Sequence, residues 1–237
     1  MVEHHEVPVA GGESVAAVHH EAPSNRWFVC CHGFLSDKSG SYERRCRRAV
    51  QEGYNGVRFD FRGCGESDGA FVEQGVSEKI ADLEAVVDDV EPSSIVLFGS
   101  SFGGKVAFHA ATGLDRVEAV VTRAPVTDNR AFDNYRSSVA ADGEHRFETG
   151  DRIDDRFFED LDRYPFDDVV SALDVPVAIF HGTADESVDV DDSIDATRRL
   201  ETDVLLQTFS AEGHRFSAPA ESRLLALTFD WLESIRS

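Results

Sequence analysis

A short segment near the middle of the chain holds the residues best suited to covalent chemistry. Gly99–Gly103 (GSSFG) matches the pattern G-x-S-x-G, directly after the apolar run Ile95–Phe98 and before a stretch compatible with a helix. A serine in such a strained strand-to-helix turn has its hydroxyl exposed above the sheet edge, and free backbone N–H groups at the helix start lie close to it. The pattern therefore predicts that Ser101 is a nucleophile.

A nucleophilic serine needs a base that takes its proton and a carboxylate that orients the base. His214 follows the last predicted strand and is the expected base, and Asp185, in the loop after the penultimate strand, is the expected orienting acid. Asp128, just after an earlier strand, is the alternative acid. The order Ser…Asp…His along the chain is one of the known orders for this set of residues. His181, directly before a glycine at a strand end, is expected to shape a turn instead.

The same segment resembles a phosphate-binding loop. Gly99, Gly104 and Lys105 fit G-x-x-x-x-G-K, but Val106 stands where such a loop needs a hydroxyl that holds magnesium. Nucleotide binding is therefore the weaker alternative.

The elements around these residues alternate between strand and helix. Predicted strands cover 5–10, 14–20, 27–31, 56–61, 95–98, 117–122, 175–180 and 204–209, and predicted helices cover 42–52, 76–90, 105–112, 193–200 and 218–235. This alternation predicts one α/β domain over 1–237, a mostly parallel sheet with helices on both faces. Sites in such sheets form at the carboxyl ends of the strands, where the candidate residues stand.

The interval 128–173 interrupts this alternation. It is rich in Asp, Arg and Phe, shows no clear strand, and is long for a plain connection. We expect a small helical cap inserted above the sheet. The alternative, a disordered acidic loop, fits its many aromatic residues less well.

The motifs together resemble the α/β-hydrolase superfamily. They are HGF at 32–34, DFRGCGESDG at 60–69, GSSFGG at 99–104, HGTADESV at 181–188 and GHRFS at 213–217, and within the superfamily the chain is most similar to small carboxylesterases of the cinnamoyl/feruloyl-esterase type and to serine-aminopeptidase-like hydrolases. The resemblance implies the α/β-hydrolase fold and an oxyanion hole formed by the backbone N–H groups of Phe34 and Phe102. Asp60 and Arg62 are expected to fix a nearby loop through an internal ion pair.

The resemblance also implies an activity. We expect a carboxylesterase that cleaves a small-molecule acyl ester through an acyl-serine, with no metal or organic cofactor. A peptidase, a thioesterase or an acyltransferase would use the same triad, and a non-catalytic binding protein could use the same scaffold, so these alternatives stay open.

Composition restricts the partners and the setting. The 237 residues carry 45 acidic and 23 basic side chains, a net charge of −22, and only Lys38, Lys79 and Lys105 are lysines. This pattern resembles cytoplasmic proteins of extreme halophiles, and an ordinary acidic enzyme is the alternative. The negative charge disfavours nucleic acid and anionic membranes as partners.

The amino-terminal region lacks an apolar signal-like segment, and so we expect a cytoplasmic protein. The histidine pairs at 4–5 and 19–20 are expected to face solvent, with no metal site.

Overall fold

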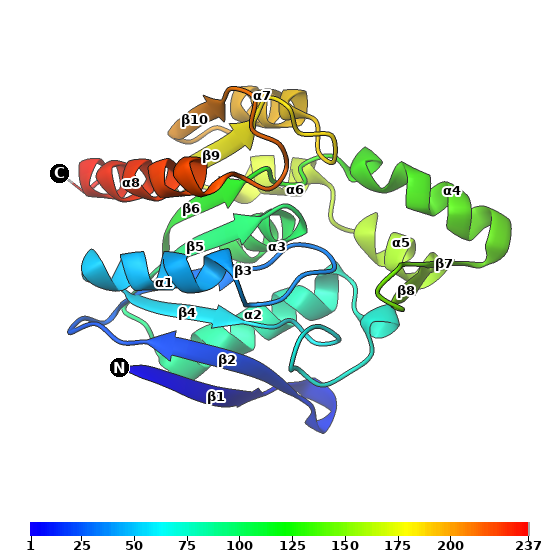
Figure 1. Cartoon of the computed structure of the whole chain (residues 1–237), viewed down its shortest axis with the longest axis horizontal. Helices are drawn as coiled ribbons and strands as arrows, with labels where there is room; N and C mark the ends of the chain where they lie inside the picture. The colour runs from blue at the N-terminus through cyan, green and yellow to red at the C-terminus, as the bar shows by residue number, and fades with distance from the viewer. Residues whose placement is uncertain (237) are drawn as a thin grey trace.

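An eight-stranded sheet forms the centre of the molecule (Figure 1). The structure is a computed structural model that describes residues 1–236. The strands lie in the order β1-β2-β4-β3-β5-β6-β9-β10. Their bounds are β1 Val2–Pro8, β2 Ser14–His20, β3 Arg26–Cys31, β4 Asn55–Phe59, β5 Ser94–Ser100, β6 Val117–Arg123, β9 Val177–Gly182 and β10 Val204–Phe209. Strand β2 pairs antiparallel with both β1 and β4, and the remaining pairs are parallel. The predicted α/β-hydrolase fold is thereby confirmed.

Helices cover both faces of this sheet because its central strands are apolar on both sides. The helices are α1 Ser41–Gln51, α2 Val76–Val90, α3 Phe102–Ala111, α7 Val190–Arg199 and α8 Ala218–Ser234. One core cluster joins α1 and α8 to the sheet through residues such as Cys46 and Phe229, and the other joins α2 and α3 through residues such as Leu83 and Phe108. Parallel strands bring the loops after β3, β5, β9 and β10 to one edge.

The segment between β6 and β9 contains both helices and strands. It forms α4 Asp133–Asp142, β7 Glu144–Arg146, β8 Arg152–Asp154, α5 Asp155–Leu161 and α6 Phe166–Ala172. The expectation that 128–173 lacks strands is wrong, because β7 and β8 pair as a short antiparallel hairpin. In Figure 1 the elements α4 to α5 lie beyond the carboxyl ends of the parallel strands. Helix α6 instead packs beside the sheet, where Phe166 contacts Phe108 of α3.

The histidine pair at 19–20 is buried, with 7% of His19 and 3% of His20 exposed. The expectation of solvent-facing side chains is wrong here because β2 lies inside the sheet, between β1 and β4.

All four cysteines are free and buried, as expected for Cys30 and Cys31. Among residues 1–236, no helix has the length and apolar character needed to cross a membrane.

Candidate active site

Ser101 occupies the turn between β5 and α3 with an uncommon backbone conformation, φ 55° and ψ −120°. A non-glycine residue in this region is strained, and such strain is often found at functional sites. The flanking glycines are required by close approach: a Cβ on Gly103 would lie 2.4 Å from the carbonyl oxygens of Cys31 and His32. A Cβ on Gly99 would lie 2.4 Å from the Gly103 carbonyl oxygen. The G-x-S-x-G pattern therefore reflects the packing of this turn.

The two adjacent serines have different surroundings. Ser100 is fully buried, and its hydroxyl accepts a hydrogen bond from Nη1 of Arg45 at 3.2 Å. Ser101 is partly exposed and lines a pocket. Of the two hydroxyls, that of Ser101 is the one a substrate can reach.

His214 and Asp185 form a hydrogen-bonded pair at the same edge of the sheet. Nδ1 of His214 lies 2.7 Å from Oδ2 of Asp185. A carboxylate can only accept here, so Nδ1 carries the proton and Nε2 of the neutral ring is left as an acceptor. The other carboxylate oxygen of Asp185 accepts the backbone N–H groups of Ser187 and Val188, at 2.8 and 3.0 Å. Asp185 is thereby fixed on both sides.

The charge of Asp185 is stabilised where its side chain is fully buried. Burial alone would raise the pKa of Asp185, but hydrogen bonds from His181 and His214 and from the Val188 N–H lower it well below its usual range. Nε2 of His181 lies 3.2 Å from the Asp185 carboxylate, and Nδ1 lies 2.7 Å from the Ser193 hydroxyl. His181 thus supports Asp185, a role that the sequence did not reveal beyond the four-residue spacing of the two.

The alternative acid, Asp128, does not reach this histidine. Its carboxylate accepts the backbone N–H of Arg130 at 2.9 Å and pairs with the Arg130 guanidinium at 3.0 Å. Of the two carboxylates considered from the sequence, the structure brings only Asp185 to His214.

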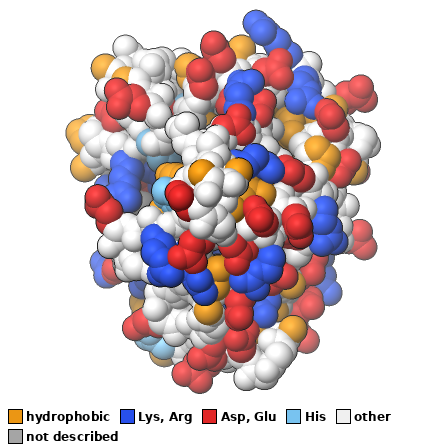
Figure 2. Space-filling view, turned by 90° about the vertical axis from the view of Figure 1, so that its right-hand side faces the viewer, with side chains coloured by type: hydrophobic (Ala, Val, Ile, Leu, Met, Phe, Trp, Pro, Cys, Tyr) orange, Lys and Arg blue, Asp and Glu red, His pale blue; other side chains and the backbone are white. Residues whose placement is uncertain are grey.

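Ser101 and His214 border one pocket of about 420 Å³. Its lining combines the apolar or aromatic residues Phe34, Leu35, Val126, Ala131, Phe132, Tyr135 and Val188 with the polar residues Ser101, Ser187, His214 and Arg215. Ser101 and His214 follow the carboxyl ends of β5 and β10. Figure 2 shows the molecule from that side, and acidic and basic side chains are mixed over this face.

The loop after β3 places Phe34 beside the nucleophile. A Cβ on Gly33 would lie only 3.4 Å from Cβ of Ser101. Phe102 is the first residue of α3, so its N–H has no partner within the helix. Among residues 1–236, no hydrogen bond is formed by the backbone N–H of Phe34. Both expected oxyanion donors therefore remain available to a ligand.

His32 anchors this loop from within the core. Its Nε2 accepts the Phe61 N–H at 3.0 Å, and so Nδ1 donates to the Gly33 carbonyl oxygen at 2.9 Å. Burial, together with the positive charge of Lys79, lowers the pKa of His32 to about 4. His32 is therefore a neutral structural residue and not a second base.

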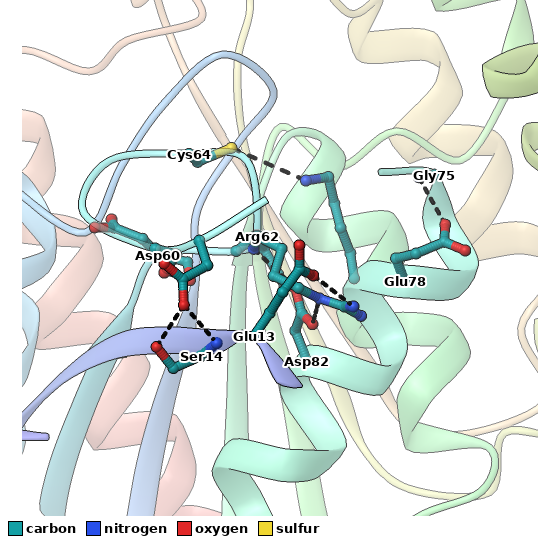
Figure 3. A network of polar contacts seen from close by, with 12 residues as sticks. Glu13, Ser14, Asp60, Arg62, Cys64, Gly75, Glu78 and Asp82 are labelled. Carbon is teal, nitrogen blue, oxygen red and sulfur yellow. Dashed lines mark hydrogen bonds and ion pairs between the residues drawn. The ribbon is translucent and has the colours of Figure 1, made fainter. Parts of the chain in front are cut away.

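Asp60 and Arg62 lie in two separate ion pairs. Asp60 pairs with Lys38, and Nε of Arg62 lies 2.6 Å from Oδ1 of Asp82. Figure 3 shows Arg62 between Asp82 and Glu13. The expected role in fixing the loop thus involves partners from elsewhere in the chain rather than a pair formed within the motif.

Lys105, the lysine of the phosphate-loop resemblance, is engaged elsewhere. Its ammonium donates to Oδ1 of Asn129 at 2.9 Å and to the carbonyl oxygen of Tyr164. Burial lowers the pKa of Lys105 to about 8. The side chain links α3 to the segment between β6 and β9, which argues against phosphate binding at this loop.

One group of side chains has ligand atoms close enough to hold a metal ion. These atoms of His5, His19 and Asp89 lie within 4.8 Å of one another on β1, β2 and the end of α2. None of the three residues lines the pocket beside Ser101.

The comparisons with known proteins agree with this fold. A family model described as the prolyl oligopeptidase family matches residues 42–235. Mouse mitochondrial palmitoyl-protein thioesterase ABHD10 is 28% identical over 218 residues, which cover 84% of this chain and 72% of that protein. The solved structure of alpha/beta hydrolase domain-containing protein 10 from mouse superposes with a TM-score of 0.88 at 24% identity, over 99% of this chain and 100% of that one. Est1E from Butyrivibrio proteoclasticus, solved with ferulic acid bound, gives a TM-score of 0.85 at 21% identity, over 98% and 100% of the two chains. The chain therefore belongs to the prolyl oligopeptidase family and is an α/β-hydrolase.

Proposed function

We propose that this hydrolase is a carboxylesterase that cleaves acyl esters through a covalent intermediate on Ser101. One observation carries the proposal: a serine in a strained turn and a histidine hydrogen-bonded to a buried aspartate border the same pocket. This is the set of groups that acyl transfer to serine requires.

The proposed reaction begins at the free nitrogen of His214. Nε2 takes the proton of the Ser101 hydroxyl while Oγ attacks the ester carbonyl carbon. The negative charge that develops on the carbonyl oxygen is held by the N–H groups of Phe34 and Phe102. The protonated ring, stabilised by Asp185, then gives its proton to the departing alcohol oxygen. Water repeats these steps on the acyl-serine and releases the acid.

The pocket wall supports an apolar acyl group. The ring of Phe34 lies against six other aromatic rings, those of Phe71, Phe102, Phe132, Tyr135, Phe147 and Phe157, with centroids 5.2 to 6.5 Å apart. Such packing leaves a rigid apolar surface with few rotamers to order on binding. An acyl chain or a cinnamoyl-type ring would bury its surface there.

A thioesterase is the second candidate, favoured by the similarity to palmitoyl-protein thioesterase ABHD10 over 84% of this chain. The same residues would act, with a thiolate leaving in place of an alcohol. Esters and thioesters of one acyl group, compared by kcat/KM, separate the two candidates.

The test uses three substrate classes that share one acyl group: a p-nitrophenyl ester, an alkyl thioester and an anilide. We expect ester turnover that is lost in Ser101→Ala and retained in Ser100→Ala, because only Ser101 borders the pocket. If kcat/KM for the thioester were far above that for the ester, the protein would be a thioesterase and not a carboxylesterase. No turnover of any class by the folded protein would contradict the proposal.

A further inference from the structure

A second depression adjoins the pocket beside Ser101. It has a volume of about 510 Å³ and shares Leu35 and Arg215 with that pocket. Three arginines line it: Arg44 from α1, Arg123 from the end of β6, and Arg215, which directly follows His214. We call it the arginine depression.

None of these three arginines forms an ion pair with a carboxylate among residues 1–236. This is notable in a chain with 45 acidic and 23 basic residues, where a nearby carboxylate is easy to supply. The two acidic residues that line the depression are already engaged. Glu221 lies 2.6 Å from Nε of Arg45, and Asp37 accepts the N–H of Ser39 at 2.7 Å.

Arg123 has an unfilled donor within this site. Its Nε is buried and has no hydrogen-bond acceptor in the described structure. The neighbouring Arg45 is fully buried, and its Nη2 also lacks an acceptor. Burial and the charge of Arg45 lower the pKa of Arg123. Among residues 1–236, Glu221 pairs with Arg45 and no carboxylate pairs with Arg123, so an anion in the depression would meet a guanidinium group that has no ion-pair partner.

The position of the depression indicates which part of a substrate would reach it. Arg215 directly follows His214 in the chain, and it lines both the pocket beside Ser101 and the arginine depression. In the proposed mechanism His214 delivers the proton to the leaving group, so that group lies on the His214 side.

Resting on the proposed acyl transfer at Ser101, we propose that the arginine depression binds an anionic group, a carboxylate or a phosphate, on the leaving-group side of the substrate. Guanidinium groups hold both anions through paired hydrogen bonds. The preferred substrates are then acyl esters or thioesters of a negatively charged alcohol or thiol, despite the negative charge of the whole protein.

The test compares three phenyl esters of one acyl group, whose para substituents are hydroxymethyl, carboxymethyl and phosphonomethyl. All are assayed at one fixed ionic strength. We expect kcat/KM for at least one anionic ester to exceed that of the neutral ester about tenfold or more, and the stronger of the two identifies the anion. Equal values for all three esters would overturn the proposal.

Variants locate the effect. Arg123→Gln and Arg44→Gln are each expected to remove most of the anionic preference while changing the neutral ester less than about threefold. Arg44 is exposed, so its variant folds even if that of Arg123 does not. Arg198→Gln is the matched control, because Arg198 is exposed on α7 outside the depression. Loss of preference in this control as well would show a bulk charge effect and contradict a local subsite.

A binding measurement separates this proposal from the proposed function. Ser101→Ala is titrated with 4-hydroxyphenylacetate and with 4-hydroxybenzylphosphonate by calorimetry. The same titration is repeated with the double variant Ser101→Ala/Arg123→Gln. Weaker anion binding by the double variant than by Ser101→Ala supports the subsite even if no ester is turned over. No binding of either anion, in a protein that does hydrolyse the neutral ester, overturns the subsite alone.

Discussion

Replacing Asp185 by Asn is the most revealing change to the proposed triad. The substitution keeps the size of the side chain and removes its charge. One carboxylate oxygen accepts the N–H groups of Ser187 and Val188, so the amide oxygen of the variant is held at that position. The amide NH₂ then faces Nδ1 of His214, whose N–H donates a hydrogen bond to the wild-type carboxylate at 2.7 Å.

This arrangement changes the tautomer of His214. Nδ1 must accept from the amide, and so the ring proton moves to Nε2, the nitrogen that should take the Ser101 proton. In a serine protease triad the equivalent change lowers kcat about 10⁴-fold with the geometry intact. We expect a similar loss here, about 5 kcal/mol in the activation free energy. The melting temperature should fall by only a few degrees, because the backbone hydrogen bonds to the side chain persist.

Steady-state hydrolysis of a p-nitrophenyl ester measures the effect. Asp128→Asn is the matched control, since Asp128 lies in the loop after strand β6 and pairs with Arg130 instead of His214. This control should retain nearly full activity. Activity of Asp185→Asn within about tenfold of wild type, or an equal loss in Asp128→Asn, would mean that Asp185 does not orient His214.

Three further predictions concern stability. Gly103→Ala should destabilise the fold by a few kcal/mol, because its Cβ would lie 2.4 Å from two carbonyl oxygens, whereas Gly113→Ala, whose Cβ would meet nothing closer than 3.9 Å, should be nearly neutral in thermal unfolding. Burial lowers the pKa values of His19, His20 and His32 to about 4, so the unfolded chain binds these protons first and the free energy of unfolding should fall as pH drops from about 6.5 to about 4. For His32 alone the free energy of unfolding should fall by about 3 kcal/mol. Urea unfolding at constant molar salt measures this change, and a free energy of unfolding that stays constant over this pH range would contradict the prediction. Because the protein carries a net charge of −22, salt should weaken the repulsion between its carboxylates. The melting temperature should therefore rise from about 0.1 M to molar KCl, as the Debye length shortens from about 10 to about 3 Å. A melting temperature that stays level or falls would mean that the acidic composition is not an adaptation to salt.

The sequence predicted best the features that local spacing encodes. The turn around Ser101 needs glycines within four residues of each other, and β5 and β9 each contain a continuous apolar run, so both features were visible without a structure. His214 could be selected because it follows the last strand, where parallel strands bring their carboxyl ends together.

Features that depend on distant pairing could not be predicted in this way. The partner of Arg62 is Asp82 on α2, and Glu221, the partner of Arg45, is 176 residues away. Strands β7 and β8 have only three residues each, too few to show an alternating pattern. The burial of His19 and His20 follows from the position of β2 inside the sheet, which the hairpin signal does not specify.

Labelling with a fluorophosphonate probe shows which serine is the nucleophile, because the probe reacts only with an activated serine. The folded protein should gain one adduct, mapped by mass spectrometry of the tryptic peptides to Ser101, and His214→Ala should slow the labelling strongly. An adduct on Ser100 or elsewhere, or no adduct on the folded protein, would contradict the assignment of Ser101 as the nucleophile.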